Sequence, residues 1–171
     1  MEFAKLIRER YSVRSYKSIP VEEEKLQAVL EAARLAPTAA NRQPFRVFVI
    51  PTEGRREELG KVCSPDWFAE APLVLAVVAL KDKCWVRKYD QRPYGEVDAA
   101  IVMDHMVLAA HDQGLGTCWI GMFHPEAARE LLELGEEMDP IAFTPLGYSS
   151  DVPGPKKRRP LEALVVDMRG E

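Results

Sequence analysis

The sequence of 171 residues has few cysteines, and their spacing does not suit metal or disulfide chemistry. Cys63, Cys84 and Cys118 are odd in number and include no Cys-x-x-Cys pair. Zinc ribbons, iron–sulfur clusters and disulfide frameworks need more thiols, or thiols closer together. The three histidines follow no His-Glu-x-x-His or comparable spacing. The sequence therefore predicts idle thiols in a reducing compartment and no metal site.

A long apolar run is also missing. A helix that crosses a bilayer needs about 20 apolar residues, and the longest apolar stretch, residues 97–110, is interrupted by Asp98, Asp104 and His105. The first five residues carry charge and lack the apolar centre of a signal peptide. We expect a cytoplasmic protein with no membrane partner.

The chain has no excess of positive charge. Its 23 Lys and Arg residues against 27 Asp and Glu give a net charge of −4, which argues against a nucleic-acid partner. Hydrophobic residues make up 47% and charged residues 29%, an ordinary globular composition. Because domains cluster around ~100–150 residues, we expect a single domain over residues 1–171.

Hydrophobic periodicity predicts helices and strands that are interleaved along the chain. The expected helices cover residues 3–10, 20–36, 53–62, 96–113 and 125–134. The expected strands cover residues 45–50, 73–80, 117–120 and 141–146. The order lacks regular βαβ spacing, so it predicts an α+β fold with a central, mostly antiparallel sheet flanked by helices.

Three further segments carry structural expectations. The helix over 96–113 is apolar on nearly every side, which predicts a central, fully packed helix with a left-handed cap at Gly114. Residues 82–95 hold turn formers, aromatics and charges and are expected to run over the surface. Residues 164–166 are strand-like and follow a complete set of core elements. They pair either with this chain's own sheet or with the sheet edge of a partner, and composition leaves both open.

Two basic segments are candidates for phosphate binding. RYSVR at 10–14 places Arg10 and Arg14 around a helix end, where planar guanidinium groups suit a phosphate. The run KKRR at 156–159 offers further positive charge. The alternatives are a solvated basic turn for the first segment and a solvated run or localisation tag for the second.

Two other segments suit the close approach of a flat ligand. Residues 36–45, APTAANRQPF, place small residues between prolines and offer the amides of Asn41 and Gln43. Residues 114–122, GLGTCWIGM, contain glycines that let main-chain N–H groups face a ligand. The alternatives are a plain connector in which Asn41 bonds its own backbone, and a helix cap followed by a strand.

In this order the four segments resemble the nitroreductase family of FMN-dependent oxidoreductases. The matching motifs are RxSVR near residue 10, APTAxNxQPF at 36–45, GLGTCWIG at 114–121 and PLGY with the basic run at 145–159. The resemblance extends from residue 3 to residue 166, and it implies a nitroreductase-like fold. It also implies a homodimer with FMN at the subunit interface and a C-terminal arm, about residues 160–171, exchanged with the partner.

The resemblance implies a role for each matching residue. The FMN phosphate, ribityl chain and pyrimidine edge are assigned to Arg10, Tyr11, Ser12 and Arg14, and the second half of the phosphate clamp to Lys156 and Arg158. The flavin is lined from the other subunit by the loop that contains Pro37, Thr38, Ala39 and Asn41. The main chain around Gly121 and Met122 is expected to donate a hydrogen bond to flavin N5.

The implied function is electron transfer from NADH or NADPH to a small organic acceptor, such as a nitroaromatic, a quinone or an enone. The mechanism implied is ping-pong, with hydride transfer at flavin N5 and no catalytic side chain. The alternative is a flavin-binding protein of the same fold with specialised chemistry, such as dehalogenation or flavin turnover, or with no turnover. Three residues depart from the common pattern, namely Tyr11, Thr38 and Met122, and the short 82–95 segment predicts an open pocket.

Overall fold

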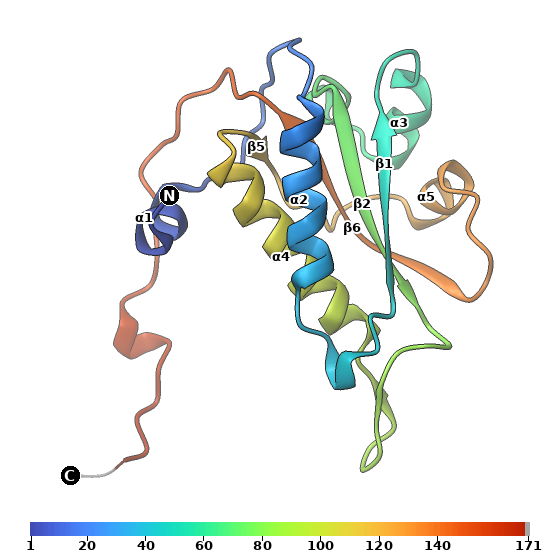
Figure 1. Ribbon diagram of the computed structural model, residues 1–171, viewed down its shortest axis with the longest axis vertical. Coiled ribbons are helices and arrows are strands. Elements are labelled where there is room, and N and C mark those ends of the chain that lie inside the picture. Colours follow the sequence, from blue (N-terminus) through green and yellow to red (C-terminus); the bar gives the residue numbers. More distant parts are fainter. Residues whose placement is uncertain (170–171) are drawn as a thin grey trace.

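A four-stranded antiparallel sheet lies between two layers of helices in the computed structural model, which describes residues 1–169 (Figure 1). The strand order is β1-β2-β6-β5, and all three pairings are antiparallel. The strands are β1 (Phe45–Pro51), β2 (Leu73–Leu80), β5 (Gly116–Thr117) and β6 (Met138–Gly147). The predicted α+β fold with a mostly antiparallel sheet is confirmed.

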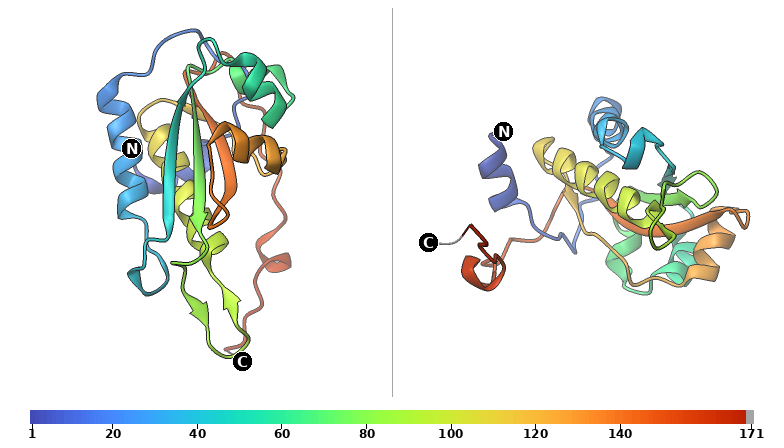
Figure 2. Two further views of the ribbon diagram at one scale, coloured as in Figure 1. Left: turned by 90° about the vertical axis from the view of Figure 1, so that its right-hand side faces the viewer. Right: turned by 90° about the horizontal axis from the view of Figure 1, so that it is seen from below.

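The helices cover both faces of this sheet (Figure 2). One layer holds α2 (Glu23–Leu35) and α4 (Gly95–Asp112), and the other holds α3 (Arg56–Val62) and α5 (Pro125–Leu131). Helix α1 (Phe3–Glu9) contacts α4 away from the sheet. Short 3₁₀ turns occur at η1 (Ala39–Asn41), η2 (Asp66–Ala69) and η3 (Leu161–Ala163).

Strand β2 explains why the sheet is buried on both sides. Its side chains alternate, so that Leu75 and Val77 join the core with α2 and α4, while Val74, Ala76 and Val78 join the core with α3 and α5. A strand with two covered faces needs apolar residues at every position. The uninterrupted apolar run seen in the sequence is this strand.

Two predicted elements end elsewhere, for local reasons. The strand expected over 117–120 stops after Thr117, because the N–H of Cys118 bonds the Thr144 hydroxyl and pairing resumes only where Ile120 bridges Phe143. Helix α5 ends at Leu131, short of residue 134, because Glu133 adopts a left-handed conformation with φ 52°.

Strand β6 begins three residues earlier than predicted. Pro140 pairs with Val78 and Ala142 with Val77, which leaves Ile141 as the extra residue of a β-bulge. Proline lacks an N–H for the ladder and is tolerated at such a bulge. The strand predicted over 141–146 therefore continues through Pro140 and begins at Met138.

The prediction that the long helix is packed on every side was wrong for this chain. Residues 97, 101, 105 and 108 share one face of α4, and this face is incompletely covered. Val97 is 38% exposed, while Ile101, His105 and Leu108 are half-buried. An apolar sequence all round the helix is equally suited to a helix that faces another subunit. The cap at Gly114 is confirmed, since its φ is +75°.

The C-terminal tail forms no strand within the described residues. It turns once at η3 and otherwise runs beside α1 and away from the sheet (Figure 1). Its apolar side chains are exposed, namely Leu161, Leu164, Val165, Val166 and Met168. The strand-like residues 164–166 therefore do not pair with this chain's own sheet. Residues 170 and 171 of the expected arm lie outside the described residues.

The connection from α2 to β1 contains an unusual backbone. Ala40, Asn41 and Gln43 have φ values of 52°, 53° and 50°, in the left-handed region that glycine normally occupies. None of the three is a glycine. The conformation must therefore be imposed by contacts around it.

We expect Ala40→Gly to raise the free energy of unfolding by about 0.5–1 kcal/mol, because the left-handed conformation costs an alanine more than it costs a glycine. The matched control, Ala28→Gly in the middle of α2, should lower it by about 1 kcal/mol. Urea denaturation of both variants measures the two changes. A loss of stability in Ala40→Gly equal to that of the control would contradict the strain.

Candidate functional site

The first basic segment is held between two other segments of the chain. The N–H of Val13 donates to the carbonyl of Thr117 at 2.9 Å, and on the other side the N–H of Ser150 donates to the carbonyl of Ser15 at 3.0 Å. A Cβ at Gly116 would lie 2.6 Å from a Val13 methyl group. Gly116 therefore serves this close approach and does not face a ligand, which corrects the expectation for that glycine.

A polar network fastens the same segment to the root of the C-terminal tail. The Asp151 carboxylate accepts the N–H of Arg14 at 2.9 Å and the hydroxyl of Tyr11 at 3.0 Å. The Ser149 hydroxyl lies 2.6 Å from the same carboxylate and 2.7 Å from the Tyr11 hydroxyl. Sequence reasoning assigned Tyr11 to the cofactor and missed Asp151 and Ser149. The Ser-Ser-Asp run after β6 was the available signal, because such short side chains bond nearby main chain.

Burial acts to raise the pKa of Asp151, but hydrogen bonds from Ser149, the Arg14 N–H and Tyr11 outweigh it and hold the pKa below its usual value. A carboxyl group whose pKa falls on folding stabilises the fold above its unfolded pKa, about 3.9. We therefore expect the melting-temperature gap between the parent and Asp151→Ala to be widest above about pH 4. It should shrink as the pH falls through the lowered pKa. A gap that stays constant down to about pH 2 would contradict this contribution.

Arg14 borders a cavity of about 470 Å³. One wall comes from the end of α3 and from η2, and includes Cys63 and Trp67, whose ring lies 6.0 Å from the Arg14 guanidinium. The other wall is the segment between β5 and α5, residues 118–124. The aromatic and apolar walls suit a flat ring, and the guanidinium at the edge suits negative charge.

The main chain at Gly121 and Met122 faces this cavity. A Cβ at Gly121 would meet nothing within 4 Å, and the Met122 side chain is 91% exposed. Within residues 1–169, the N–H groups of these two residues donate to no protein acceptor. The wall of the cavity thus contains two main-chain donors that are left without a protein partner.

Positive charge gathers beside the same segment. Burial lowers the pKa of Lys156, and the charges of Arg10 and Arg158 lower it further. Burial raises the pKa of the Cys118 thiol, while the charges of Arg14 and Arg10 and a hydrogen bond from Ser12 oppose that rise. The charge of Arg10 acts on both groups, and Lys156 is hydrogen-bonded to main chain just before Arg10. In the described part of the chain, ion pairs involve none of Arg10, Arg14, Lys156 and Arg158.

The protein itself provides some partners for these cations. The ammonium group of Lys156 donates to the carbonyls of Ile7, at 3.1 Å, and Arg8, which end α1. Among residues 1–169, the Arg158 guanidinium donates only to the carbonyl of its neighbour Lys157, at 2.9 Å. The predicted second half of the clamp therefore lies against the end of α1, next to Arg10.

The loop with Pro37, Thr38, Ala39 and Asn41 is not part of this cavity. It follows α2, whereas the cavity is bordered by α3, η2 and the segment after β5, and Figure 1 shows it at the lower end of α2. Gln43 donates from its side chain to the Asn41 carbonyl and side-chain oxygen, at 3.2 and 3.0 Å. Within one chain the structure thus brings eight of the twelve predicted residues into one region and leaves the four residues of this loop apart.

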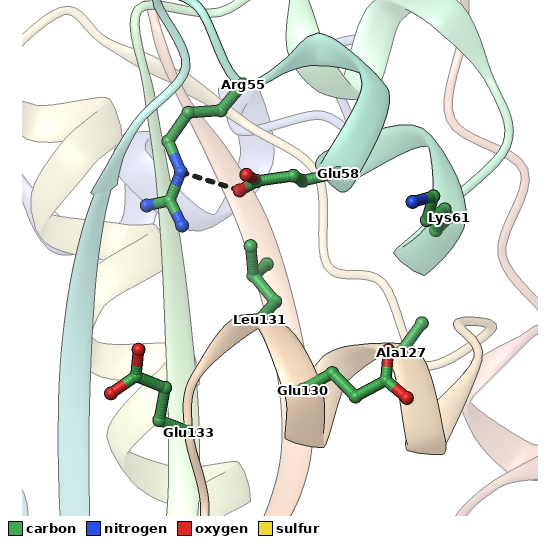
Figure 3. Close-up of a pocket in the computed structure, with 7 residues that line it drawn as sticks. All are labelled: Arg55, Glu58, Lys61, Ala127, Glu130, Leu131 and Glu133. Atoms are coloured by element: carbon green, nitrogen blue, oxygen red, sulfur yellow. Dashed lines mark hydrogen bonds and ion pairs between the residues drawn. The ribbon is translucent and has the colours of Figure 1, made fainter.

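A second hollow, between α3 and α5, holds charged side chains (Figure 3). Arg55 pairs with Glu58 at 3.0 Å, and the remaining carboxylates of Glu130 and Glu133 point across it. None of the residues predicted for the site lines this hollow. Its lining includes the apolar Ala127 and Leu131 but no aromatic ring, and its cations Arg55 and Lys61 pair with Glu58 and Glu57, so it is not the candidate site.

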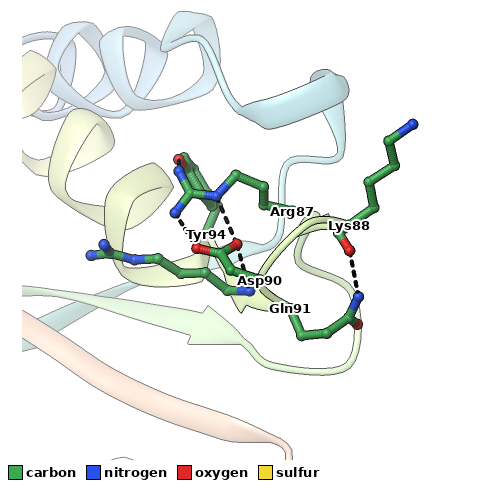
Figure 4. A network of polar contacts seen from close by, with 6 residues as sticks. Arg87, Lys88, Asp90, Gln91 and Tyr94 are labelled. Atoms are coloured by element: carbon green, nitrogen blue, oxygen red, sulfur yellow. Dashed lines mark hydrogen bonds and ion pairs between the residues drawn. The ribbon is translucent and has the colours of Figure 1, made fainter.

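The surface excursion predicted over 82–95 is a short hairpin of β3 (Val86–Arg87) and β4 (Arg92–Pro93). Figure 4 shows Arg87 between the Asp90 carboxylate, which its Nε contacts at 2.8 Å, and the Tyr94 hydroxyl at 2.9 Å. The hairpin stands out from the body and leaves Tyr89 86% exposed at its tip. It does not cover the cavity of its own chain.

Membrane-spanning and metal-binding features are both missing from the described residues. Over residues 1–169, no helix combines the length and apolar character needed to cross a membrane. No three His, Cys, Asp or Glu side chains in that range gather in a way that suits a metal ion.

Comparison with known proteins places this geometry in context. The profile of the Nitroreductase family matches residues 7–67 and 60–148. An FMN reductase (NAD(P)H) of Bacillus subtilis is 28% identical over 95% of the chain and 72% of the relative. A putative NADH dehydrogenase/NAD(P)H nitroreductase of Archaeoglobus fulgidus is 31% identical over 88% of the chain and 87% of the relative.

Solved structures agree. A nitroreductase family protein of Clostridium difficile 630 superimposes with a TM-score of 0.91 at 38% identity, covering 98% of this chain and 99% of that one. An FMN-dependent nitroreductase of Clostridium difficile R20291 gives a TM-score of 0.80 at 25% identity, covering 99% and 100%.

Proposed function

The chain belongs to the nitroreductase family, and on that premise we propose that it is an FMN-dependent NAD(P)H oxidoreductase that reduces small conjugated acceptors. One observation carries the proposal. Arg14 borders an aromatic-walled cavity, Lys156 is held against the end of α1 next to Arg10, and two main-chain donors in the cavity wall have no protein partner among residues 1–169. Phosphate, ring and N5 acceptor of one FMN molecule match these three features.

The phosphate end fits the charges. A phosphate monoester carries about −1.5 to −2 charge at neutral pH, and Arg10, Lys156 and Arg158 bring positive charge to one place. Charge-assisted bonds to such groups contribute roughly 1.5–3 kcal/mol each. Ser12 adds a hydroxyl beside Arg10 and Arg14. We assign the phosphate and ribityl contacts to these residues.

The ring end fits the cavity. When bound, FMN supplies the hydride-accepting ring, and the protein positions it and sets its electrostatics. We assign the N5 contact to the open N–H groups at Gly121 and Met122. The guanidinium of Arg14, held by its main-chain bond to Asp151, stabilises negative charge that develops at the ring edge. Tyr11 acts through the same network, since its hydroxyl bonds Asp151 and Ser149.

The acceptor side is open. Met122 and Trp119, which is 41% exposed, form the rim of the cavity, and the short hairpin stays clear of it. A single open cavity serves the nicotinamide and the acceptor in turn, which gives ping-pong kinetics. Flat nitroaromatics, quinones and enones suit its aromatic walls.

The working unit is a homodimer. The incompletely covered face of α4 and the apolar tail are surfaces that a second copy would bury. The loop of Pro37, Thr38, Ala39 and Asn41 then lines the flavin bound mainly by the partner, and the tail beyond residue 160 crosses to the other subunit. Each whole chain, residues 1–171, contributes to both sites.

The test is a spectrum of the purified protein, followed by anaerobic addition of NADH or NADPH. We expect a yellow protein with flavin bands that either nicotinamide bleaches, and that recover when a quinone or nitroaromatic is added. A yellow protein that neither nicotinamide reduces would favour a flavin-binding role without this turnover. A colourless protein that does not take up added FMN would end every flavin hypothesis.

A further inference from the structure

A buried carboxylate in α4 holds the loop that follows α2. Asp98 lies in the first turn of α4 and is 1% exposed. Its Oδ1 accepts the main-chain N–H of Ala39 at 2.8 Å, across 59 residues of sequence. The contact joins the central helix directly to a main-chain atom of the loop.

The other hydrogen bonds at this end of the loop are internal to it. The N–H of Asn41 donates to the Thr38 carbonyl at 2.9 Å, and the N–H of Gln43 donates to the Thr38 hydroxyl at 3.0 Å. Such bonds keep the shape of the loop but do not fix it to the body. A second tie, from the Arg42 guanidinium to the Cys84 carbonyl at 3.3 Å, comes later and is longer. Asp98 is therefore the tie at the start of the loop.

The carboxylate that makes this hydrogen bond also lowers the stability of the fold. Oδ2 of Asp98 is buried, and no group in residues 1–169 hydrogen-bonds it. A buried carboxylate with an unpaired oxygen destabilises a fold. The loop that it holds is itself strained, with left-handed Ala40, Asn41 and Gln43. Strain and unpaired polar atoms persist together where a backbone position must be held for function.

We propose that Asp98 is a positioning residue for FMN: through the Ala39 N–H it fixes Pro37, Thr38 and Ala39 in the conformation that lines the partner's flavin. The inference rests on the proposed function, because it takes that loop as a wall of the flavin site. Asp98 is thereby added to the proposed flavin site, although its position in an apolar helix gave no functional signal in the sequence.

Three variants separate this role from a general effect of charge in α4. Asp98→Ala removes the acceptor. Asp98→Asn keeps one acceptor oxygen for the Ala39 N–H and removes the charge. Glu96→Ala is the matched control, since Glu96 is an exposed acid in the same helical turn whose carboxylate accepts no hydrogen bond from the loop within residues 1–169, whereas Asp98 does.

The first measurement is amide hydrogen exchange of the FMN-free protein over residues 36–45. Asp98→Ala should exchange faster at Ala39, while Asp98→Asn and Glu96→Ala should match the parent. Equal protection of the Ala39 N–H in Asp98→Ala and in the parent would show that Asp98 does not hold the loop. This readout needs no flavin, so it remains decisive for the loop whatever becomes of the proposed function.

The second measurement is the dissociation constant of FMN for the same dimeric proteins. Losing one bond to a charged acceptor should weaken binding by about tenfold in Asp98→Ala, and Asp98→Asn should restore most of it. Unchanged affinity in Asp98→Ala overturns the positioning role, as does an Asp98→Asn variant that is equally impaired. A parent that binds no FMN overturns the proposed function, and with it this role.

If Asp98→Ala does not fold, Ala39→Pro takes its place. It deletes the N–H donor at the first position of a 3₁₀ turn, after an extended Thr38, where a proline is tolerated. Faster exchange of the neighbouring amides and weaker FMN binding are expected. Parent-like values for both would overturn the inference.

Discussion

Replacing Arg10 and Arg14 together by alanine is expected to weaken FMN binding by about two orders of magnitude or more. Both guanidinium groups lie close enough to Cys118 for their charge to oppose the rise in its pKa. Neither belongs to an ion pair among residues 1–169, so neither is neutralised there by a carboxylate. Removing both takes away the core of the proposed clamp.

The measurement is flavin fluorescence during titration of the FMN-free protein, with the reduction rate by NADPH on the reloaded protein as a second readout. A matched control is Arg34→Ala with Arg55→Ala, which removes two exposed arginines that pair with Glu31 and Glu58 elsewhere. The control should bind FMN as the parent does. Parent-like affinity in Arg10→Ala/Arg14→Ala would show that the cofactor site is elsewhere.

The second large effect is expected from the tail. Leu164 and Val166 are 60% and 86% exposed in the single chain. Burying a leucine or valine side chain contributes about 1.5–3 kcal/mol, so Leu164→Asp with Val166→Asp should raise the dimer dissociation constant about 100-fold or more. Because the flavin site is proposed to span two subunits, FMN affinity should fall with it.

Sedimentation velocity over a range of concentrations measures the change. Lys17→Asp with Ile19→Asp is the control, because it places two aspartates at the same spacing on another exposed segment. If Leu164→Asp/Val166→Asp remains dimeric and keeps its FMN, the proposed arm exchange is contradicted. The proposed phosphate clamp does not depend on this result.

Elements with a strong local signal were predictable from the sequence. Strand β2 could be predicted because an apolar run of strand length between Pro72 and Lys81 suits few structures other than a buried strand. The left-handed cap at Gly114 could be predicted because glycine after a helical pattern is typical of a helix C-terminus. The order of the four motifs along the chain also predicted that distant segments share a site. The segments that contain Arg14 and Gly121 do border one cavity.

Contacts between distant polar groups were not predictable. Asp151 reads as an ordinary loop residue, and only the folded chain shows its bonds to Arg14 and Tyr11. Asp98 reads as an interruption in an apolar helix until its bond to Ala39 is seen. Strand β5 is shorter than predicted because one side-chain hydroxyl takes the place of a ladder acceptor. In each case the deciding partner lies at least 26 residues away.

The fastening of residues 11–16 to residues 148–151 has a consequence for biosynthesis. The segment proposed to hold the cofactor is made early, whereas Asp151 follows Arg14 by 137 residues and Tyr11 by 140. A ribosome-bound fragment that ends before Asp151 lacks the carboxylate that bonds the Arg14 N–H and the Tyr11 hydroxyl. Cofactor loading must then wait until Asp151 has been made and has folded back, and nascent chains stalled before this point should emerge without flavin.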